Sequence, residues 1–180
     1  MKYPSREECL RDYLEIKTPQ NIIEHVIVVN KVAVFLAKKL KKKGIKLNLR
    51  LVDKASLLHD LDKWLCINDK SLKHGFETEK MLAEKGYPEI GFYARQHVAE
   101  LILGELKTWE EKIINYADKR VLHDQIVSLK ERFDYINERY PAKDFEKRRK
   151  IIELSYVLEK EIFSKLGFSP EELKGALASK

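Results

Sequence analysis

Apolar residues recur every three or four positions along most of the chain, the spacing that places side chains on one face of an α-helix. Val29, Val32 and Leu36 form such a stripe, and His25 lies on it. Together with start and stop signals, the spacing predicts helices at about 5–16, 19–44, 48–61, 74–85, 88–103, 108–118, 128–140, 143–166 and from 169 onward.

The ends of these predicted helices carry capping signals. The capping box spacing occurs in Ser5 with Glu8, Thr108 with Glu111 and Ser128 with Glu131. Thr18 and Pro19 are typical of an N-cap followed by the first helical residue, while Gly44 and Gly86 are typical of helix ends. These signals place the helix boundaries independently of the apolar spacing.

No segment alternates as a strand would, and we find no internal repeat, low-complexity tract or linker. Residues 62–73 lack a clear period and are predicted to form a turn and a loop. The pattern therefore predicts a single all-α domain that spans residues 1–180.

Composition narrows the class of protein. The 180 residues are 44% hydrophobic and 36% charged, too apolar for a disordered chain and without the long apolar run of a membrane protein. The first residues carry charges throughout, where a signal peptide needs an apolar stretch, so we expect a cytoplasmic protein without membrane partners. Cys9 and Cys66 cannot form a disulfide framework and are expected to be reduced thiols.

The net charge of +6 permits an anionic partner. Its densest source is Lys38–Lys43, at the end of a predicted helix. This run fits a solvated helix terminus, where cations are favoured, and it also fits a surface for nucleic acid. Aromatic residues of the kind that stack on bases are absent from it, which favours the first interpretation.

Histidine and aspartate positions carry the most information about chemistry. His25, His59, His74 and His97 lie on or beside the inward faces of predicted helices, and Asp118 shares a face with Ile114. Asp60 directly follows His59. Five different predicted helices thus each direct a histidine or an aspartate toward the interior.

Such a set is costly to bury without compensation. One unpaired buried polar group costs about 1–3 kcal/mol, and a domain is stable by only about 5–15 kcal/mol. A single histidine is readily satisfied by a hydrogen bond, but six groups together need a stronger compensation. Divalent cations provide it, because neutral imidazole and ionised carboxylate are their ligands.

The order His25, His59-Asp60, His74, His97, Asp118 resembles the HD-domain superfamily of metal-dependent phosphohydrolases over about residues 19–135. Residues 141–180 would then be a C-terminal helical extension. A second doublet, His123-Asp124, has no such partners and is interpreted as incidental.

The two histidines between the doublet and the last aspartate are similar to those of the binuclear members of that superfamily. The resemblance implies two divalent transition-metal ions, drawn from iron, manganese, nickel, cobalt and zinc. It assigns His25, His59, Asp60 and Asp118 to one ion. It assigns His74 and His97 to the other, with Asp60 as the bridging ligand.

The resemblance also implies an activity: hydrolysis of a phosphoester or phosphoanhydride, by a hydroxide that bridges the two ions. By analogy with relatives, the substrate is expected to be a nucleotide or dinucleotide. Asp60 and Lys63 are the expected catalytic residues, and Lys63, Lys119 and Arg120 are the candidates for contact with substrate phosphates. Arg132 is a weaker candidate, and Asp62 stands where relatives often have glycine.

A second interpretation remains open. The chain could be a nucleotide- or RNA-binding regulatory module that keeps the metal pocket for structural reasons, as the basic charge would permit. The expected partner is a small phosphorylated molecule, with nucleic acid the less favoured choice. The long charged helix at 143–166 is expected to cover the bundle or to pair with a second copy in a homodimer.

Overall fold

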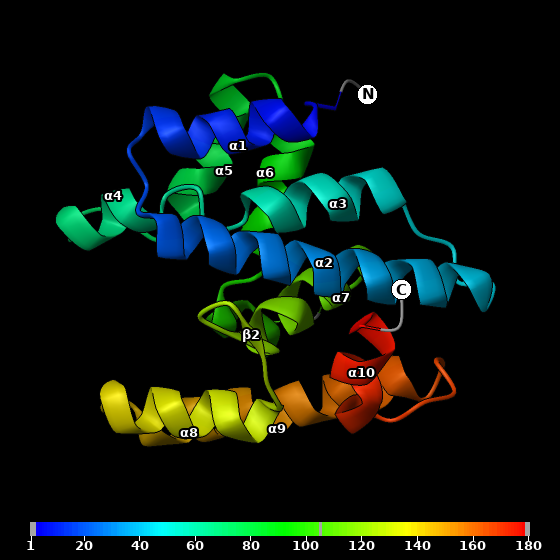
Figure 1. Ribbon diagram of the computed structural model, residues 1–180. Helices are drawn as coiled ribbons and strands as arrows, with labels where there is room; N and C mark the ends of the chain where they lie inside the picture. Colours follow the sequence, from blue (N-terminus) through cyan, green and yellow to red (C-terminus); the bar gives the residue numbers. More distant parts are fainter. Residues whose placement is uncertain (1–2, 105, 179–180) are drawn as a thin grey trace.

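Helices occupy most of the chain in the computed structural model, which describes residues 3–104 and 106–178 (Figure 1). The first half contains α1 (Arg6–Glu15), α2 (Gln20–Lys42), α3 (Leu49–Leu58), α4 (Lys63–Asn68), α5 (Phe76–Glu84) and α6 (Pro88–Arg95). The second half contains the 3₁₀ turn η1 (Ala99–Leu103), α7 (Trp109–Lys119), β1 (Val121–Leu122), β2 (Gln125–Ile126), α8 (Leu129–Arg139), α9 (Phe145–Phe163), η2 (Pro170–Glu172) and α10 (Leu173–Ala178). The prediction of an all-α fold is confirmed.

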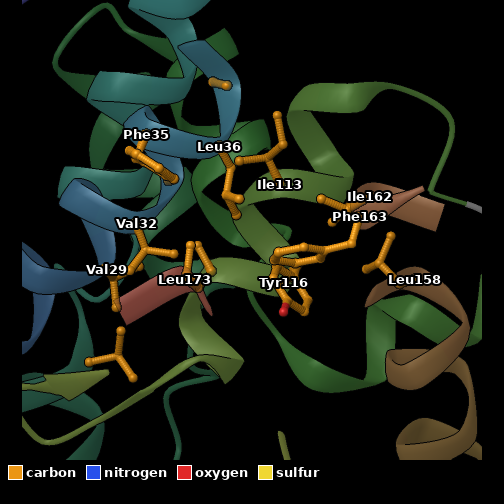
Figure 2. Close-up of a cluster of buried hydrophobic side chains, with 14 of the residues drawn as sticks. Val29, Val32, Phe35, Leu36, Ile113, Tyr116, Leu158, Ile162, Phe163 and Leu173 are labelled. Carbon is orange, nitrogen blue, oxygen red and sulfur yellow. The ribbon is translucent and has the colours of Figure 1, made fainter. Parts of the chain in front are cut away.

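The long helix α2 lies at the centre of the bundle (Figure 1). Its first turns pack with α1, α3, α5 and α6 in a hydrophobic cluster that includes Tyr13, Val26 and Leu58. Its later turns belong to a second cluster with α7, α9 and α10. Figure 2 shows Val32 and Leu36 of α2 in this cluster, beside Ile113 of α7.

The C-terminal helices are part of this second cluster. Ile162 and Phe163 of α9 and Leu173 of α10 are buried in the same cluster as Tyr116 of α7 (Figure 2). The predicted C-terminal extension therefore covers the face of α7 and α2 and supplies apolar surface to it. Because α7 also carries Asp118, this packing fixes the position of a predicted metal ligand.

The predicted capping boxes are present at α1, α7 and α8. The prediction at the start of α2 is wrong in detail, since Pro19 is the N-cap and makes no side-chain cap bond. The Thr18 hydroxyl is buried and has no hydrogen-bond partner. Thr18 instead continues the chain reversal after α1, where its main-chain N–H donates to the carbonyl of Tyr13 at 2.9 Å.

Two short elements escape the sequence pattern. The prediction of a loop over residues 62–73 is wrong for Lys63–Asn68, which form α4. No residue of α4 is fully buried, so this helix has no apolar stripe to detect. The prediction of no strands is also wrong, because β1 and β2 form an antiparallel hairpin, with Val121 paired to Ile126. Two residues per strand are too few to show alternation.

The single helix predicted at 88–103 is interrupted. α6 ends at Arg95, and the chain resumes as the 3₁₀ turn η1 at Ala99. The buried amide of Asn115, on α7, donates to the carbonyl of Gln96 at 2.6 Å and approaches that of Val98 at 3.4 Å. A side chain from another helix therefore satisfies the carbonyls that the break leaves free.

Within the described ranges, α2 is long and apolar enough to span a membrane by length and composition alone. Half of the most apolar 18-residue stretch of α2 is buried inside the protein. The middle of α2 also carries Asn30, whose amide donates to the hydroxyl of Ser56 at 3.0 Å. The apolar composition of α2 is thus explained by its central place in the bundle. The cytoplasmic location stays a prediction.

Candidate metal centre

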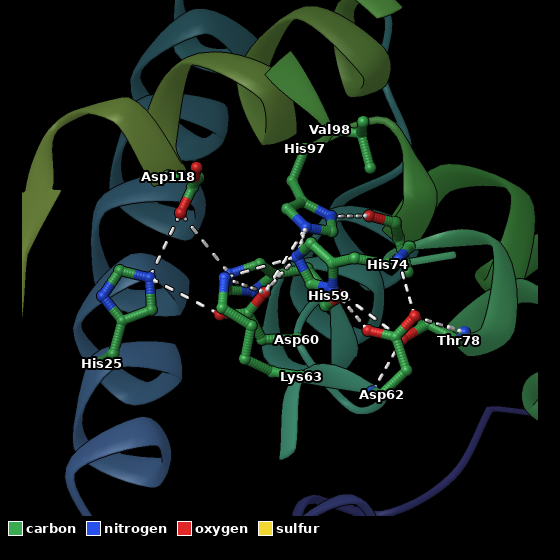
Figure 3. A network of polar contacts seen from close by, with 12 residues as sticks. His25, His59, Asp60, Asp62, Lys63, His74, Thr78, His97, Val98 and Asp118 are labelled. Carbon is green, nitrogen blue, oxygen red and sulfur yellow. Dashed lines mark hydrogen bonds and ion pairs between the residues drawn. The ribbon is translucent and has the colours of Figure 1, made fainter. Parts of the chain in front are cut away.

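Six side chains that are distant in the sequence converge at one place beside α2 (Figure 3). The set comprises His25 from α2, His59 and Asp60 from the turn after α3, His74 from the turn before α5, His97 from the turn after α6, and Asp118 from α7. The structure therefore brings together all six residues predicted to bind metal.

Their local placement differs from the prediction in one respect. Only His25 and Asp118 lie within helices, because α3 ends at Leu58 and leaves the doublet in a turn. In that turn the N–H of Lys63 donates to the carbonyl of Asp60 at 3.0 Å. The doublet therefore lies just past the end of α3, where His59 still has helical dihedral angles.

The first half of the cluster is formed by His25, His59 and Asp118. One carboxylate oxygen of Asp118, Oδ1, lies 3.1 Å from Nε2 of His25 and 3.7 Å from Nε2 of His59. Oδ2 of Asp60 lies 4.0 Å and 3.7 Å from the same two nitrogens. Two carboxylates and two imidazoles thus surround one point.

The second half is formed by His74 and His97, and Asp60 belongs to it as well. Oδ1 of Asp60 lies 3.1 Å from Nε2 of His74 and 3.4 Å from Nε2 of His97. Each oxygen of Asp60 therefore faces a different pair of histidines. This is the geometry expected of a carboxylate shared by two cations.

All four rings are held by a partner at the other nitrogen, Nδ1. The carbonyl oxygens of His123, Ser56 and Ala94 each lie 2.8 Å from Nδ1 of His25, His59 and His97, in that order. Asp62 Oδ1 lies 2.6 Å from Nδ1 of His74. Since these oxygens can only accept, each Nδ1 carries a proton, and in the neutral ring Nε2 is left as a lone-pair donor.

A divalent cation fits this arrangement better than the protein groups alone. Nε2 of His74 and Nε2 of His97 are 2.9 Å apart, so their lone pairs need either a proton or a cation between them. Nε2 of His59 and Oδ1 of Asp60 are buried without a hydrogen-bond partner. Buried acceptor atoms that have no hydrogen-bond donor are typical of metal ligands.

Electrostatics keep both carboxylates ionised. Burial alone would raise the pKa of Asp60, but Lys63 and His59 outweigh it and hold that pKa well below the usual value. Burial opposes ionisation of Asp118 too, yet the neighbouring rings of His25 and His59 and the charge of Arg132 hold its pKa well below the usual value. For His97, burial lowers the pKa and so favours the neutral ring that a metal requires.

Comparison with known proteins also supports a metal site at this cluster. The family model described as HD domain matches residues 22–159. The chain belongs to the HD domain family. HD domains form a superfamily of metal-dependent phosphohydrolases, and the histidine and aspartate cluster of this one fits a metal site. The match extends beyond residue 135, where the resemblance seen in the sequence ended.

One relative is an uncharacterized protein of Methanocaldococcus jannaschii. It is 29% identical over 124 residues, which cover 61% of this chain and 72% of the relative. No solved structure matches the chain at a comparable level of significance. These comparisons place the chain in a family and leave the substrate of this HD domain to be argued from its site.

Lys63 lies at the edge of the HD-domain cluster, as the sequence predicts. Its Nζ is 3.7 Å from Oδ1 of Asp60 and 3.4 Å from Nε2 of His74. The side chain is 40% exposed, so the ammonium group can meet a molecule that approaches from solvent. Asp60 raises the pKa of Lys63, so this group is a fixed cation.

The predicted phosphate contacts at Lys119 and Arg120 are contradicted by their surroundings. Nζ of Lys119 is buried and donates to the carbonyl and side-chain oxygens of Asn115, at 3.0 and 2.7 Å. Arg120 is buried on the side of the C-terminal helices, where it bonds Glu159 at 3.2 Å and the carbonyl of Pro170 at 3.0 Å. Adjacent helical residues point in different directions, so proximity to Asp118 in the sequence did not place these cations at the cluster.

Arg132, the weaker candidate, is better placed. Its charge helps to lower the pKa of Asp118, and it opposes protonation of Lys63. Its Nε is buried with no hydrogen-bond partner, and among the described residues no carboxylate forms an ion pair with it. Arg132 is thus an uncommitted cation at the first half of the cluster.

Sequence reasoning missed the functions of Asp62 and Gly75. In the sequence, Asp62 is notable only because relatives often have glycine there, yet its carboxylate bonds the His74 ring. Gly75 has φ of +82°, and a Cβ there would approach Cγ2 of Val98 to 2.4 Å. Only glycine fits this position, which brings the turn before α5 close to His97. The glycine directly after a candidate histidine was the available signal.

The His123-Asp124 doublet has no metal-binding place in the cluster, but its main chain has a function. His123 lies in the turn of the β1–β2 hairpin with φ of +54°. Its carbonyl accepts from Nδ1 of His25. The hairpin thus orients the first ligand, a contact that no side-chain pattern reveals.

Proposed function

We propose that this HD domain is a phosphohydrolase that uses two divalent transition-metal ions to cleave a phosphoester or phosphoanhydride bond in a nucleotide or dinucleotide. The observation that carries the proposal is the position of Asp60. Its two oxygens face two different histidine pairs, so one carboxylate belongs to two groups of metal ligands at once. A structural ion would need only one such group.

The residues divide naturally between the two ions. His25, His59 and Asp118 would hold the first, and His74 and His97 would hold the second, with Asp60 shared. This mixture of imidazole and carboxylate suits iron, manganese, cobalt, nickel or zinc. When bound, such ions supply Lewis acidity toward phosphoryl oxygens and lower the pKa of water.

The two nearby cations complete the binding of a phosphoryl group. Lys63 stands at the exposed edge of the second half, where its ammonium would neutralise charge that develops on a phosphoryl oxygen. The charge of Arg132 acts on Asp118, and its Nε has no hydrogen-bond partner, so this guanidinium is suited to bind a phosphate. We therefore assign the phosphate contacts to Lys63 and Arg132, in place of Lys119 and Arg120.

A small substrate is favoured over a polynucleotide. The lysine run Lys38–Lys43 begins 13 residues after His25 on the same helix, which corresponds to a separation of about 20 Å. A mononucleotide or dinucleotide bound at the cluster would not need it. Lys39 also packs over the ring of Phe35 at 5.5 Å, a contact that gives this residue a structural function.

The test is a substrate screen. Metal-free protein is loaded in turn with each of the five metals, iron under anaerobic conditions, and offered nucleoside phosphates, dinucleoside polyphosphates, cyclic dinucleotides and simple phosphomonoesters. His59→Ala serves as the matched control, because it removes a buried ligand. We expect release of a phosphorylated product with at least one metal, absent from the control. Equal rates for both proteins on every substrate would overturn the proposal.

A further inference from the structure

One of the four histidines is held differently from the others. His25, His59 and His97 bond neutral main-chain carbonyls through Nδ1. His74 is the one ring of the four whose Nδ1 bonds a carboxylate, that of Asp62. His74 is also the most exposed ring of the four, at 30%, and it lies in a turn and not in a helix. The ligand with the weakest support from packing thus has the strongest hydrogen-bond partner.

Asp62 is itself tightly fixed. It is fully buried, and its Oδ2 accepts from the main-chain N–H groups of Gly75 at 2.6 Å and Thr78 at 3.0 Å. Its own N–H donates to the hydroxyl of Thr78 at 3.0 Å. Gly75, the N-cap of α5, has no side chain to cap the helix, so Asp62 caps it from outside. One carboxylate therefore ties together the turn after α3, the start of α5 and the His74 ring.

These bonds define Asp62 as a support for a ligand and not as a ligand. Both of its carboxylate oxygens already accept hydrogen bonds from protein donors. Asp62, Cys66 and His74 do lie close enough together to suggest a separate metal group. However, the His74 nitrogen on this side, Nδ1, carries the proton of its bond to Asp62, so this group offers no free imidazole lone pair.

We propose that Asp62 is a positioning residue that sets the metal affinity of the second half of the cluster. The carboxylate orients the His74 ring so that Nε2 points at Asp60 and His97, and it makes that nitrogen a stronger electron donor. Outer partners of this kind contribute about 10–100-fold to metal affinity. The inference rests on the ligand assignment of the proposed function, and it concerns a position where relatives often have glycine.

The decisive variant is Asp62→Asn, which keeps the size of the side chain. An amide cannot accept on both sides, so its NH₂ group must face either the N–H groups of α5 or the His74 ring. In the second orientation it favours the tautomer with the proton on Nε2, which removes the metal-binding lone pair. Either orientation weakens the support of His74.

The measurement is a titration of the metal-free protein with Mn²⁺ by calorimetry. We expect Asp62→Asn to lower the affinity for one of the two Mn²⁺ ions about 10–100-fold. The affinity for the other ion should stay within about threefold of the wild-type value. With Co²⁺, the absorption of the second ion should also change, because the geometry of one ligand has changed. Far-UV circular dichroism confirms that the variant is folded.

Thr78→Val is the matched control, because it removes a partner of Asp62 and leaves the carboxylate in place. It should lower thermal stability while both Mn²⁺ affinities stay as in the wild type. If Asp62→Asn does not fold, Asp62→Ser replaces it, since a serine hydroxyl can accept a hydrogen bond but carries no charge. The same selective weakening is expected from it.

His74→Ala separates the inference from the proposed function. If His74→Ala loses one ion and Asp62→Asn, or its Asp62→Ser substitute, binds both as the wild type does, the role of Asp62 is refuted and the metal centre stands. If His74→Ala still binds two ions, the ligand assignment itself is wrong. Equal weakening by Asp62→Asn and Thr78→Val would show that Asp62 acts only on the fold, and this too refutes the inference.

Discussion

The two halves of the metal centre are built on different parts of the fold. The first takes His25 and Asp118 from helices α2 and α7, which pack together through a buried hydrophobic cluster. The second takes His74 and His97 from turns that join helices. His59 is fully buried in the first half, whereas His74 is 30% exposed in the second.

This difference indicates that the halves are stabilised by different forces. In the first half, apolar packing of α2 against α7 adds to the hydrogen bonds at Nδ1 of His25 and His59, so its ligands are in place before an ion arrives. Hydrogen bonds hold the second half, through Asp62 at His74 and through the carbonyl of Ala94 at His97. We therefore expect the second ion to be the weaker one and the more responsive to conditions.

The largest effect should follow from removal of the residue that the halves share. Asp60→Asn replaces a carboxylate that faces both histidine pairs, so the variant should bind both ions far more weakly or not at all. Because bound metal contributes several kcal/mol to the transition state, turnover should fall by at least about 10³-fold. Retention of one tight ion in this variant would show that Asp60 is not a bridge.

Lys63→Met should have the next largest effect, because it removes the cation at the exposed edge of the second half. Loss of a fixed group that stabilises developing charge lowers kcat by about 10²–10³-fold. Lys80→Met, on the exposed surface of α5, is the control and should leave kcat unchanged. Steady-state kinetics on a substrate identified by the screen provides the measurement, and equal kcat values for the two variants would count against Lys63.

Arg132 and Arg120 form a contrasting pair. Arg132→Met should raise KM and lower kcat/KM by about tenfold or more, the value of a charged hydrogen bond, with little change in stability. Arg120→Met should leave KM unchanged but lower the free energy of unfolding by about 1–3 kcal/mol, since it removes the hydrogen bonds of a buried guanidinium to Glu159 and to the carbonyl of Pro170. Steady-state kinetics and urea unfolding measure the two effects. A raised KM for Arg120→Met and an unchanged KM for Arg132→Met would support the prediction from sequence that Arg120 contacts phosphate.

The smallest effect concerns pH. Burial alone would lower the pKa of His74, but Asp60 and Asp62 outweigh it and raise that pKa to about 9 in the metal-free protein. A metal must displace this proton, so the affinity for the second ion should rise with pH up to about 9, by at most about tenfold per unit from this group. Calorimetry in buffers of different ionisation enthalpy should detect the released proton, and no uptake by the buffer at pH 7 would contradict the expectation.

The same shift affects the stability of the metal-free protein. A raised pKa contributes stability that is complete below the ordinary histidine value of 6.5 and is lost as the pH rises through about 9. The thermal unfolding temperature of the metal-free wild type should therefore fall as the pH rises across this range. His74→Gln should show a shallower dependence, and identical pH profiles for the two proteins would argue against the shift.

The helices and the ligand set were predictable because they depend on patterns with long range in the sequence. Apolar spacing located the helices, and burial cost made the histidines and aspartates conspicuous. The supports of those ligands were not predictable in the same way. The carbonyl of His123 and the amide of Asn115 act through tertiary contacts that leave no periodic trace.

The errors at Lys119 and Arg120 have a related cause. Both follow Asp118 in the sequence, and both are cations, but each is buried in a direction set by the rotation of α7. Arg132 follows Arg120 by 12 residues and lies on α8, and nothing in the sequence pattern brings α8 to the cluster. Which helices meet is decided by packing, and packing could not be derived from spacing alone.

The most direct test of the two-ion centre is the metal content of the protein after reconstitution with Mn²⁺ and removal of free ions, measured with the wild type and with His97→Ala. The account predicts two ions per chain for the wild type and one for the variant, in which the first half is intact. A wild-type protein that retains one ion or none, or a variant that still holds two, would contradict it.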